Sequence, residues 1–471
     1  MLQSLRGMGI PVHPHIAEAG YDWCGGKPFD IQRRTVEMLT ENHRAYVLNS
    51  MGTGKTKCAL WAFDYLRRSN SCRRMLVVAP LSTLRFTWGH EIFLTTPMYK
   101  FNVLHGDREK RLKLLAEPKD IYVINHDGLR VIADEVAKRP DIDVICIDEL
   151  ATYRNRVKKT RIAEDLCKRK PIVWGMTGAP TPNAPTDVFQ QAKIITPHTV
   201  PKYFSNFRDA TMYRINQFKF APRPGSQETA IAALQPNVRF TLDDVMELPP
   251  FISRVMDVEM GDKQQAIYNA VKRDCFALLQ QGKIKAANAG AVMSKLLQVS
   301  LGWVYLDGGK VAHLDNEARN KALLDTIMAA EKKVLVFVPF KHALRGIKDL
   351  LDAENVSNEM VSGDTPLAER DRIFRAFQFG EKPRVIEAHP ECVSHGITLT
   401  AADTIIWYGP ITSTEIYDQA NARIRRVGQA SKQLFLHLQA TASERHIYNL
   451  LRRKITVQDE LLKMLEMESA L

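Results

Sequence analysis

The sequence predicts an α/β protein of two tandem lobes, each built on a parallel β-sheet, with helical insertions between them. Short apolar runs recur along the 471 residues, each followed by a polar or glycine-containing turn and a helix-like segment. This alternation is typical of buried parallel strands joined by crossover helices. The runs form two series, separated by about 150 residues (roughly 180–330) without a comparable series. The chain is also too long for one compact core.

The two series give five predicted strands in the first lobe and four in the second. They cover 45–50, 75–80, 121–126, 143–149 and 171–178, then 334–340, 384–389, 403–409 and 434–440. Between the series, 263–283 and 289–299 have helical spacing. The segments APRPGSQ (221–227) and ELPPF (247–251) are the clearest breaks. We place the boundary just before the second, with an N-terminal lobe at 1–243 and a C-terminal lobe at 244–471.

Composition restricts the class of protein. There are 65 Lys and Arg against 53 Asp and Glu, a net charge of +12, which favours polyanionic partners without proving one. No apolar run approaches the roughly 18–20 residues of a membrane span. The N-terminus lacks the pattern of a secretory signal. Seven scattered cysteines without a CxxC pair argue for reduced thiols and against a disulfide framework or zinc site.

The stretch LNSMGTGKT (48–56) follows the first predicted strand and precedes a predicted helix. Its glycines let backbone N–H groups curl around phosphates, and the helix N-terminus adds positive potential. Lys55 is predicted to reach the β- and γ-phosphates and Thr56 to ligate Mg²⁺. Asn49 stands where the strict motif has glycine, at the position least constrained by phosphate contact. The predicted nucleotide-binding residues are Met51, Gly52, Thr53, Gly54, Lys55 and Thr56.

A second motif of the predicted nucleotide site is an apolar strand that ends in adjacent acids, DVICIDEL. We expect Asp148 to hold Mg²⁺, through its water shell, and Glu149 to orient or deprotonate the attacking water. Apolar strands also end in solvated acidic turns, so this interpretation depends on the phosphate loop upstream.

A third stretch, YDQANARIRRVGQ (417–429), carries three arginines. On a predicted helix, Arg423 and Arg426 share a face and Arg425 points elsewhere. Two guanidiniums from the second lobe could act as arginine fingers on a γ-phosphate held by the first. A solvated basic helix face is the simpler alternative.

These stretches, in order, resemble superfamily 2 helicases and, within them, the Swi/Snf-type DNA translocases. The resemblance spans about residues 28 to 455 and rests on MGTGKT, VVAPLSTLRFTWGHE, YVINHDGLR, IDEL, MTGAPTPN, VLVFVPF, SHGITLTAADTIIWYG and QANARIRRVGQ. It implies two tandem RecA-like lobes with ATP bound between them. Members tend to lack the first glycine of the loop, which accounts for Asn49.

The resemblance also implies roles for individual residues. Gln32 would contact the nucleotide base, although an exposed helix residue is the alternative, and Gly396 would line the nucleotide cleft. Trp88 is either a nucleic-acid contact or core, and Thr181 belongs to the segment that relays nucleotide state. Small and hydroxyl residues suit backbone contacts. The predicted nucleic-acid contacts, some of them equally readable as turn residues, are Ser82, Thr83, Asn125, His126, Thr177, Gly178, Ser362, Gly363, Thr398 and Thr400.

Some positions depart from the family pattern. Leu150 and Ala151 replace the small residue and histidine that usually follow the two acids, so coupling between cleft and track could differ. Ala422 replaces an acid before the first arginine, and GPITSTEIY replaces a DxxWNP stretch. His395 is more readily a loop residue than a catalytic one.

Together these observations predict an ATP- and Mg²⁺-dependent DNA translocase of minimal, bacterial- or phage-like plan. Duplex DNA is the favoured track and single-stranded DNA the alternative. A strand-separating or fork-remodelling helicase is the enzymatic alternative, although no wedge domain is evident. A nucleotide-gated DNA-binding module is the alternative of a different class. We expect a monomer, no membrane association, an unidentified recruiting protein, and a cytoplasmic location, or a nuclear one in a eukaryote.

Overall fold

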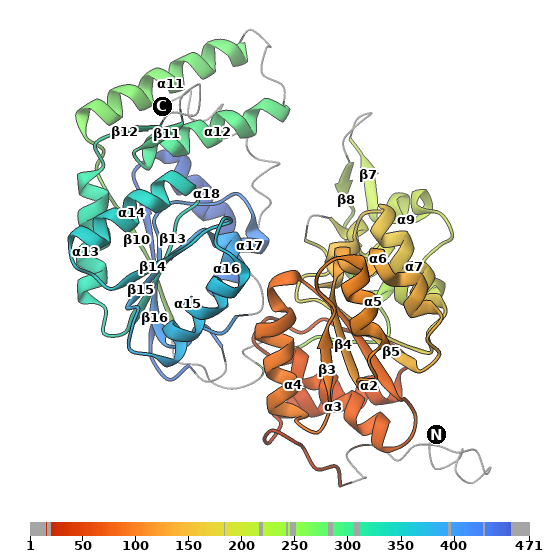
Figure 1. Cartoon of the computed structure of the whole chain (residues 1–471). Coiled ribbons are helices and arrows are strands. Elements are labelled where there is room, and N and C mark those ends of the chain that lie inside the picture. The colour runs from red at the N-terminus through yellow and green to blue at the C-terminus, as the bar shows by residue number, and fades with distance from the viewer. Residues whose placement is uncertain are drawn as a thin grey trace. The chain divides into compact units, whose positions relative to one another are not determined.

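The computed structural model describes residues 16, 20–182, 184–215, 220–241, 244, 251–280, 286–305, 311–393, 397–426 and 429–453. The chain divides into two compact units, Met1–Glu247 and Leu248–Leu471. Each unit contains a parallel sheet with helices packed against it (Figure 1). No helix among the described residues combines the length and hydropathy needed to cross a bilayer.

The first unit is built on a seven-stranded sheet in the order β3-β4-β2-β5-β6-β1-β9, with every pairing parallel. Apolar residues fill these strands because both faces of a parallel sheet are covered. The strands are β1 (Arg44–Val47), β2 (Arg74–Ala79), β3 (Phe101–Val103), β4 (Ile121–Asn125), β5 (Ile142–Asp148), β6 (Ile172–Met176) and β9 (Asn237–Val238).

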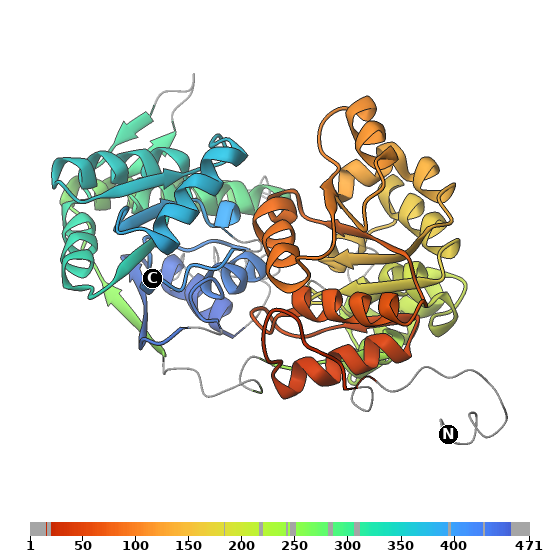
Figure 2. The same cartoon turned by 60° about the horizontal axis from the view of Figure 1, so that its bottom comes forward.

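Two hydrophobic clusters pack on opposite faces of this sheet. One joins it to α2, α3 and α4, and the other to α5, α6, α7, α8 and α10. Figure 2 shows helices on both sides of the sheet in this unit. The helices are α2 (Asp30–Glu41), α3 (Lys55–Arg68), α4 (His90–Thr95), α5 (Arg108–Ala116), α6 (His126–Ala137), α7 (Lys158–Lys168), α8 (Val188–Ile195), α9 (Phe204–Thr211) and α10 (Ser226–Ala233).

Short helical turns and one small antiparallel hairpin complete the first unit. The turns are η1 (Leu81–Thr83), η2 (Leu84–Gly89), η3 (Leu150–Tyr153), η4 (Pro185–Asp187) and η5 (Pro197–Thr199). The hairpin, β7 (Met212–Arg214) with β8 (Phe220–Pro222), forms a two-stranded sheet of its own.

The second unit has a six-stranded parallel sheet in the order β10-β17-β16-β13-β15-β14. The strands are β10 (Phe251–Asp257), β13 (Lys333–Phe337), β14 (Asn358–Val361), β15 (Val385–Ala388), β16 (Ala402–Trp407) and β17 (Gln433–Gln439), with β11 (Trp303–Tyr305) and β12 (Val311–His313) as a separate pair. The helices are α11 (Asp262–Gln280), α12 (Ala286–Ser300), α13 (Glu317–Ala329), α14 (Lys341–Ala353), α15 (Leu367–Phe379), α16 (Pro390–Val393), α17 (Thr414–Asn421) and α18 (Ala442–Arg452).

The predicted α/β fold of two RecA-like lobes is confirmed. All nine predicted strands lie in the two parallel sheets, and the helical segments at 263–283 and 289–299 overlap α11 and α12. The interval 180–330 also holds short strands, and one of them, β10, joins the second sheet as an edge strand. β10 is not evident from the sequence because its residues, FISRVMD, mix charged and apolar side chains.

Candidate nucleotide and track site

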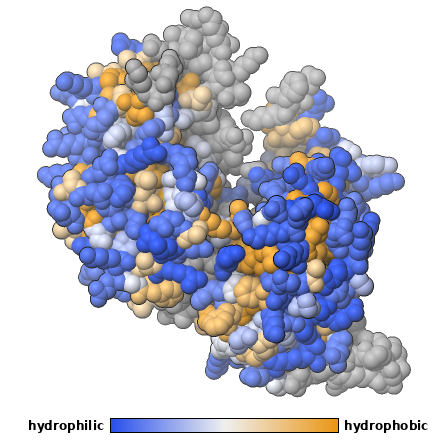
Figure 3. Space-filling model, viewed as in Figure 1, coloured by the Kyte–Doolittle hydropathy of each residue, from blue (hydrophilic) through white to orange (hydrophobic). Residues whose placement is uncertain are grey.

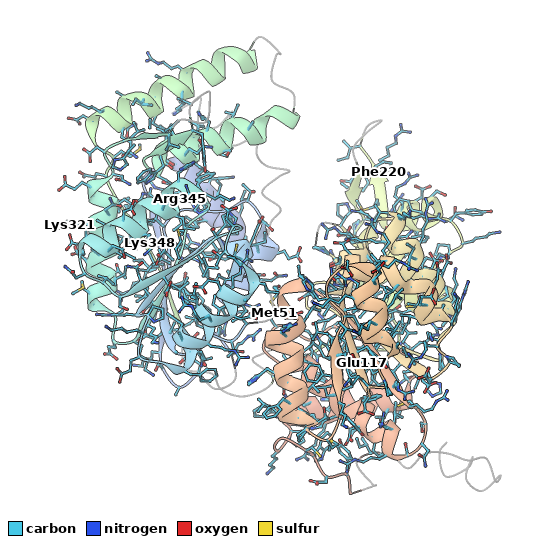
Figure 4. The ribbon with its side chains drawn as sticks, viewed as in Figure 1. Met51, Glu117, Phe220, Lys321, Arg345 and Lys348 are labelled. Carbon is cyan, nitrogen blue, oxygen red and sulfur yellow. The ribbon has the colours of Figure 1, made fainter. Side chains whose placement is uncertain are left out.

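Five polar segments meet one edge of the first sheet. The loop 48–54 follows β1, Thr177 follows β6, and Glu149 follows β5. Further along the same sheet, η1 follows β2 and His126 follows β4. Because the strands are parallel and adjacent, their carboxyl ends gather these segments on one side, where ligands bind in open α/β sheets. Met51, in the loop after β1, is labelled in Figure 4.

The loop after β1 has the backbone that phosphate binding requires. Gly52 and Gly54 both have φ of 82°, a left-handed conformation that favours glycine. Gly54 caps α3, which begins at Lys55 and runs for 14 residues. A Cβ on Gly54 would collide with the side-chain amide of Gln32. The loop therefore directs its backbone toward a helix N-terminus, an arrangement suited to anions.

Asn49 has a structural role in this loop. Its side chain is 1% exposed, donates from Nδ2 to Thr35 Oγ1 at 3.0 Å, and accepts at Oδ1 from the Phe240 backbone N–H at 3.0 Å. A glycine could make neither bond. The departure from the strict motif thus ties the loop to α2 and to the segment after β9.

Gln32 is buried rather than exposed. It is 6% exposed, donates from Nε2 to the Thr53 carbonyl at 3.0 Å, and accepts at Oε1 from the Phe29 N–H at 3.1 Å. The alternative of an exposed helix residue is therefore wrong. Its contact with a nucleotide base stays a prediction, and its position against the loop is compatible with that role.

Lys55 lies over the loop that it follows. Its Nζ donates to the carbonyls of Asn49 at 2.8 Å and Ser50 at 3.1 Å. A Cβ built on Gly178 would lie 3.7 Å from the same Nζ and 3.6 Å from the Met51 N–H. The segment after β6 therefore lies against the loop, at van der Waals distance from the Lys55 ammonium.

Asp148 is held in a defined orientation at the end of β5. Trp88 Nε1 donates to its Oδ2 at 3.0 Å, and the Glu149 N–H donates to its Oδ1 at 3.1 Å. Burial, followed by repulsion from Glu149, raises the pKa of Asp148 to about 6, while Trp88 and Lys55 act in the opposite direction. Glu149 has φ of 51°, a strained conformation for a non-glycine residue that is typical of functional sites.

The burial of Trp88 decides between the two roles predicted for it, nucleic-acid contact and core residue. It is fully buried, and thus part of the core, yet its indole N–H positions the predicted metal-binding carboxylate. Sequence reasoning missed this contact because the two residues are 60 positions apart. Trp88 lies in η2, a π-helical turn, a feature often found at functional sites.

The predicted track contacts of the first unit differ in accessibility. Ser82 is half-buried, whereas Thr83 is buried and donates from Oγ1 to the Pro80 carbonyl at 2.9 Å. Asn125 accepts from Arg111 Nη1 at 3.1 Å. Thr177 is 1% exposed, and its hydroxyl accepts from the Ala179 N–H at 3.3 Å. The side chains of Thr83 and Thr177 are therefore buried and bonded within the unit, whereas Ser82 is partly accessible.

His126 connects two of these segments. Its Nδ1 lies 3.1 Å from the hydroxyl of Tyr153, and the two rings are 5.3 Å apart. Tyr153 ends the turn η3 that begins directly after Glu149. Leu150, in that turn, is fully buried, and a Cβ on Gly175 would approach its Cδ2 to 2.6 Å. The unusual Leu150 is thus accommodated by a glycine in β6.

In the second unit, the helix predicted to carry Arg423, Arg425 and Arg426 ends before these residues. Helix α17 ends at Asn421, and Arg423 and Arg426 lie in the following turns. The Arg423 N–H bonds to the Ala420 carbonyl and the Arg426 N–H to the Ile424 carbonyl, so the helical bonding pattern has ended. The common helix face inferred for the two arginines therefore does not exist.

The three arginines have different surroundings. Arg423 is 1% exposed and donates to the carbonyls of Gln419 at 2.6 Å and Ile397 at 3.1 Å. Arg426 is half-buried, donates to Thr398 Oγ1 at 2.8 Å, and has its pKa lowered to about 10 by burial. Arg425 lies 4.3 Å over the ring of Phe251. Arg423 is buried, Arg425 and Arg426 are half-buried, and each has a contact within the unit, so the three do not form a fully solvated helix face.

The remaining candidates of the second unit lie in short loops. Ser362 and Gly363 follow β14, and their carbonyls accept from Arg370 Nη2 at 2.9 and 3.0 Å. The Thr400 hydroxyl accepts from Gln378 Nε2 at 3.1 Å. Gly396 and His395 lie outside the described residues.

Comparison with known proteins places the chain in a family. Residues 32–303 match the SNF2-related domain, and residues 318–428 match the helicase conserved C-terminal domain. The chain belongs to the SNF2-related family. This SNF2-related protein is an ATPase of the helicase and translocase type, and it uses ATP. The prediction of a minimal Swi/Snf-type member of superfamily 2 is confirmed at this level.

Its relatives span phage, bacterial and animal proteins. The putative protein p41 of Acyrthosiphon pisum secondary endosymbiont phage 1 is 25% identical over 87% of this chain and 92% of its own length. The Xenopus laevis SWI/SNF-related matrix-associated actin-dependent regulator of chromatin subfamily A-like protein 1 is 23% identical over 89% of this chain. An uncharacterized ATP-dependent helicase of Mycoplasma genitalium is 23% identical over 84% of this chain. The chain spans only 42% and 38% of these last two relatives.

The structure of the Sulfolobus solfataricus SWI2/SNF2 ATPase core in complex with dsDNA is 21% identical to this chain. It covers 91% of this chain and 92% of its own, with a TM-score of 0.44.

Proposed function

We propose that this SNF2-related ATPase moves along duplex DNA with little sequence specificity. The observation that carries the proposal is the convergence of loop 48–54, Thr177–Gly178 and Asp148–Glu149 at one sheet edge, beside η1 and His126 on the same edge. A nucleotide-responsive segment and a track-contacting segment that share an edge can change conformation together.

The end of the loop, the start of α3 and Glu149 have proposed roles in handling ATP. The N–H groups from Gly52 to Thr56 would surround the phosphates, and Lys55 would exchange its bonds to the Asn49 and Ser50 carbonyls for the γ-phosphate. Glu149 would orient and deprotonate the attacking water. The left-handed backbone of Glu149, a conformation that clusters at functional sites in non-glycine residues, supports this assignment.

The same site fits a divalent cation. Asp148 has a buried carboxylate whose two oxygens already accept directed N–H bonds, and Lys55 lies close enough to influence its pKa. Thr56 lies in the first turn of α3 beside Lys55. Mg²⁺ at Asp148 and Thr56 would neutralise charge on the phosphates.

For the second unit we retain the proposal that Arg423 and Arg426 respond to the γ-phosphate. Arg426 is the more accessible of the two. Arg423 holds the carbonyl of Ile397 and so supports the segment that carries Thr398, which is the partner of Arg426. The pair therefore links the proposed sensor to a proposed track-contacting segment, Thr398 to Thr400.

Duplex DNA is the proposed track for three reasons. The formal net charge of +12 favours a polyanion. The proposed contacts come from backbone amides and small hydroxyl residues, which suit phosphates rather than base edges. A relative in the family is named a regulator of chromatin, and another an ATP-dependent helicase. Phosphate contacts also predict a strong dependence of affinity on salt.

Steady-state ATP hydrolysis tests the proposal. Turnover would be compared without nucleic acid and with duplex DNA, single-stranded DNA or RNA. We expect duplex DNA to stimulate most, and Lys55→Ala to abolish stimulated turnover while the thermal unfolding midpoint stays near that of the wild type. Stimulation by RNA alone would contradict the DNA assignment. A slow ATPase that no nucleic acid accelerates would favour a nucleotide-gated binding module instead.

A further inference from the structure

The hairpin of β7 and β8, together with the preceding helix α9, carries a surface that the proposed ATP cycle does not use. It lies within the first unit but outside its seven-stranded sheet. Figure 1 shows the two strands projecting from the body of this unit next to α9, and Phe220 of β8 is labelled at this projection in Figure 4. We call Lys202, Tyr203, Phe204, Arg208, Tyr213 and Arg214 the hairpin surface.

The base of the hairpin is fastened to α9. Arg223, just after β8, donates from Nε to the carbonyls of Asp209 and Met212, each at 3.0 Å, and its N–H donates to the Thr211 carbonyl at 2.9 Å. The Arg208 guanidinium lies 4.6 Å over the ring of Phe220. The hairpin surface is therefore preorganised, which reduces the entropy lost on binding.

Aromatic side chains on this surface face solvent. Tyr203 is 59% exposed, Phe204 45% and Tyr213 46%, and the neighbouring Ile215 is 53% exposed. In β7, Met212 is buried, whereas Tyr213 and Arg214 are exposed. Figure 3 shows hydrophobic colouring at this end of the first unit beside hydrophilic residues. Several exposed apolar and aromatic side chains within one short stretch indicate an interaction site.

Basic residues predominate in the same stretch of the chain. Among the described residues from 202 to 223, four are basic and one is acidic, Asp209. Asp209 is paired with Arg208 at 2.8 Å. The Lys202 ammonium lies 5.4 Å over the ring of Tyr203. The described part of 202–223, which contains the hairpin surface, thus combines an excess of three positive charges with exposed aromatic side chains.

This combination fits one class of partner better than others. Unpaired bases expose π-faces that stack on aromatic rings, and their phosphates meet lysine and arginine. Duplex DNA hides its base faces, so the rings would contribute nothing there. A second copy of the chain would bring a second set of like charges to the same surface, which opposes association.

The hairpin is also connected to the nucleotide-responsive edge. Helix α10 follows it directly, and Gln227 Oε1 of that helix accepts from the hydroxyl of Thr181 at 3.2 Å. Gln191 Nε2 donates to the carbonyl of Pro180 at 2.7 Å. The segment after Gly178 is therefore bonded both to α10, which follows the hairpin, and to α8.

We propose that the hairpin surface binds a single strand of nucleic acid by stacking unpaired bases on Tyr203 and Tyr213. This goes beyond movement along a duplex. It gives the enzyme a place to hold a strand that has separated from the duplex or was never paired.

Equilibrium binding without nucleotide tests the proposal. Fluorescence anisotropy would compare labelled oligothymidine of about 20 nucleotides with a duplex of equal length. The double variant Tyr203→Ala/Tyr213→Ala is expected to weaken oligothymidine binding at least about tenfold, because two stacks are lost. Its affinity for the duplex is expected to stay within about twofold of the wild type. The matched variant Tyr203→Phe/Tyr213→Phe keeps both rings and should bind oligothymidine like the wild type.

Three results would overturn the proposal. They are unchanged oligothymidine binding in the alanine variant, an equal loss on both probes, or loss of binding in the phenylalanine variant as well. Both tyrosines are exposed, and circular dichroism melts of each variant verify that folding is intact. Binding is measured without ATP, so failure here leaves the duplex-stimulated ATPase untouched, and failure of that ATPase leaves this result standing.

Discussion

At the residue scale, the side-chain amide of Asn49 joins three segments of the first unit. It bonds to Thr35 in α2 and to the backbone of Phe240 after β9, while its own carbonyl accepts from Lys55. Neither side-chain partner is close in sequence. The amide therefore fixes the start of the phosphate loop from both sides.

We expect Asn49→Ala to destabilise the protein by roughly 1–3 kcal/mol, because the buried Thr35 hydroxyl and the partly buried Phe240 N–H each lose a partner. Thermal unfolding monitored by circular dichroism measures the effect. Asn206→Ala, at an exposed position of α9, is the control and should leave the midpoint unchanged. If the two variants unfolded alike, the structural role of Asn49 would be refuted.

A second feature at the residue scale is the buried carboxyl group of Glu387. It lies in β15 between β13 and β14, is fully buried, and neither carboxylate oxygen has a hydrogen-bond partner among the described residues. Burial raises its pKa from 4.5 to about 8, with Asp352 and Glu359 adding to the rise and Lys348 opposing it. The folded state therefore holds a proton that the unfolded state releases near pH 4.5.

The protonation of Glu387 makes the stability of the protein depend on pH. The contribution of Glu387 to stability is fully present below pH 4.5 and is lost as the pH rises toward about 8. Glu387→Gln cannot ionise, so its free energy of unfolding relative to wild type should increase from about pH 5 to about pH 8 and level off above. One pKa unit corresponds to about 1.4 kcal/mol, so the increase is at most several kcal/mol. Unfolding midpoints across this range measure it, with exposed Glu381→Gln as control; a difference independent of pH would contradict the assignment.

At the element scale, a buried ion pair joins α13 to the start of α18. Arg319 Nη2 lies 2.9 Å from both carboxylate oxygens of Glu444, and both side chains are at most 2% exposed. Glu444 also completes a capping box with Thr441 at the N-terminus of α18. Arg319 Nη1 further reaches the carbonyl of Tyr408, after β16. One arginine thus connects two helices and a strand end.

Glu444→Ala should destabilise the protein by roughly 3–5 kcal/mol, because it leaves Arg319 charged, buried and without its carboxylate. Thr441→Ala removes the cap alone and should cost about 1 kcal/mol. Chemical denaturation of both variants separates the two contributions. Equal losses would mean that the ion pair adds nothing beyond the cap.

The elements themselves were largely predictable, since long apolar runs leave little choice in a parallel sheet. Short segments, and segments that mix charged and apolar residues, were not predictable. β10 is exposed along its whole length, and the β7–β8 hairpin is stabilised by Arg223 and Arg208 rather than by an apolar pattern. The turns at Arg423 and Arg426 replaced a predicted helix because the chain leaves helical bonding after Asn421.

At the scale of the whole molecule, the motifs of the candidate site were visible in the sequence, but their supporting contacts were not. Spacing revealed the loop, the acidic pair and Thr177–Gly178, because each follows a predicted strand. The bond from Trp88 to Asp148 and the contact of His126 with Tyr153 join residues far apart in the chain. Only the folded sheet brings these residues together.

Translocation along duplex DNA is the central claim, and displacement of a third strand from a triplex measures it directly. We expect the wild-type protein with ATP and Mg²⁺ to release a labelled triplex-forming strand at a rate that follows ATP turnover. Glu149→Gln should bind ATP and DNA but release no strand, because the attacking water lacks its base. Duplex-stimulated ATP hydrolysis without strand release in the wild type, or equal release by Glu149→Gln, would contradict the account.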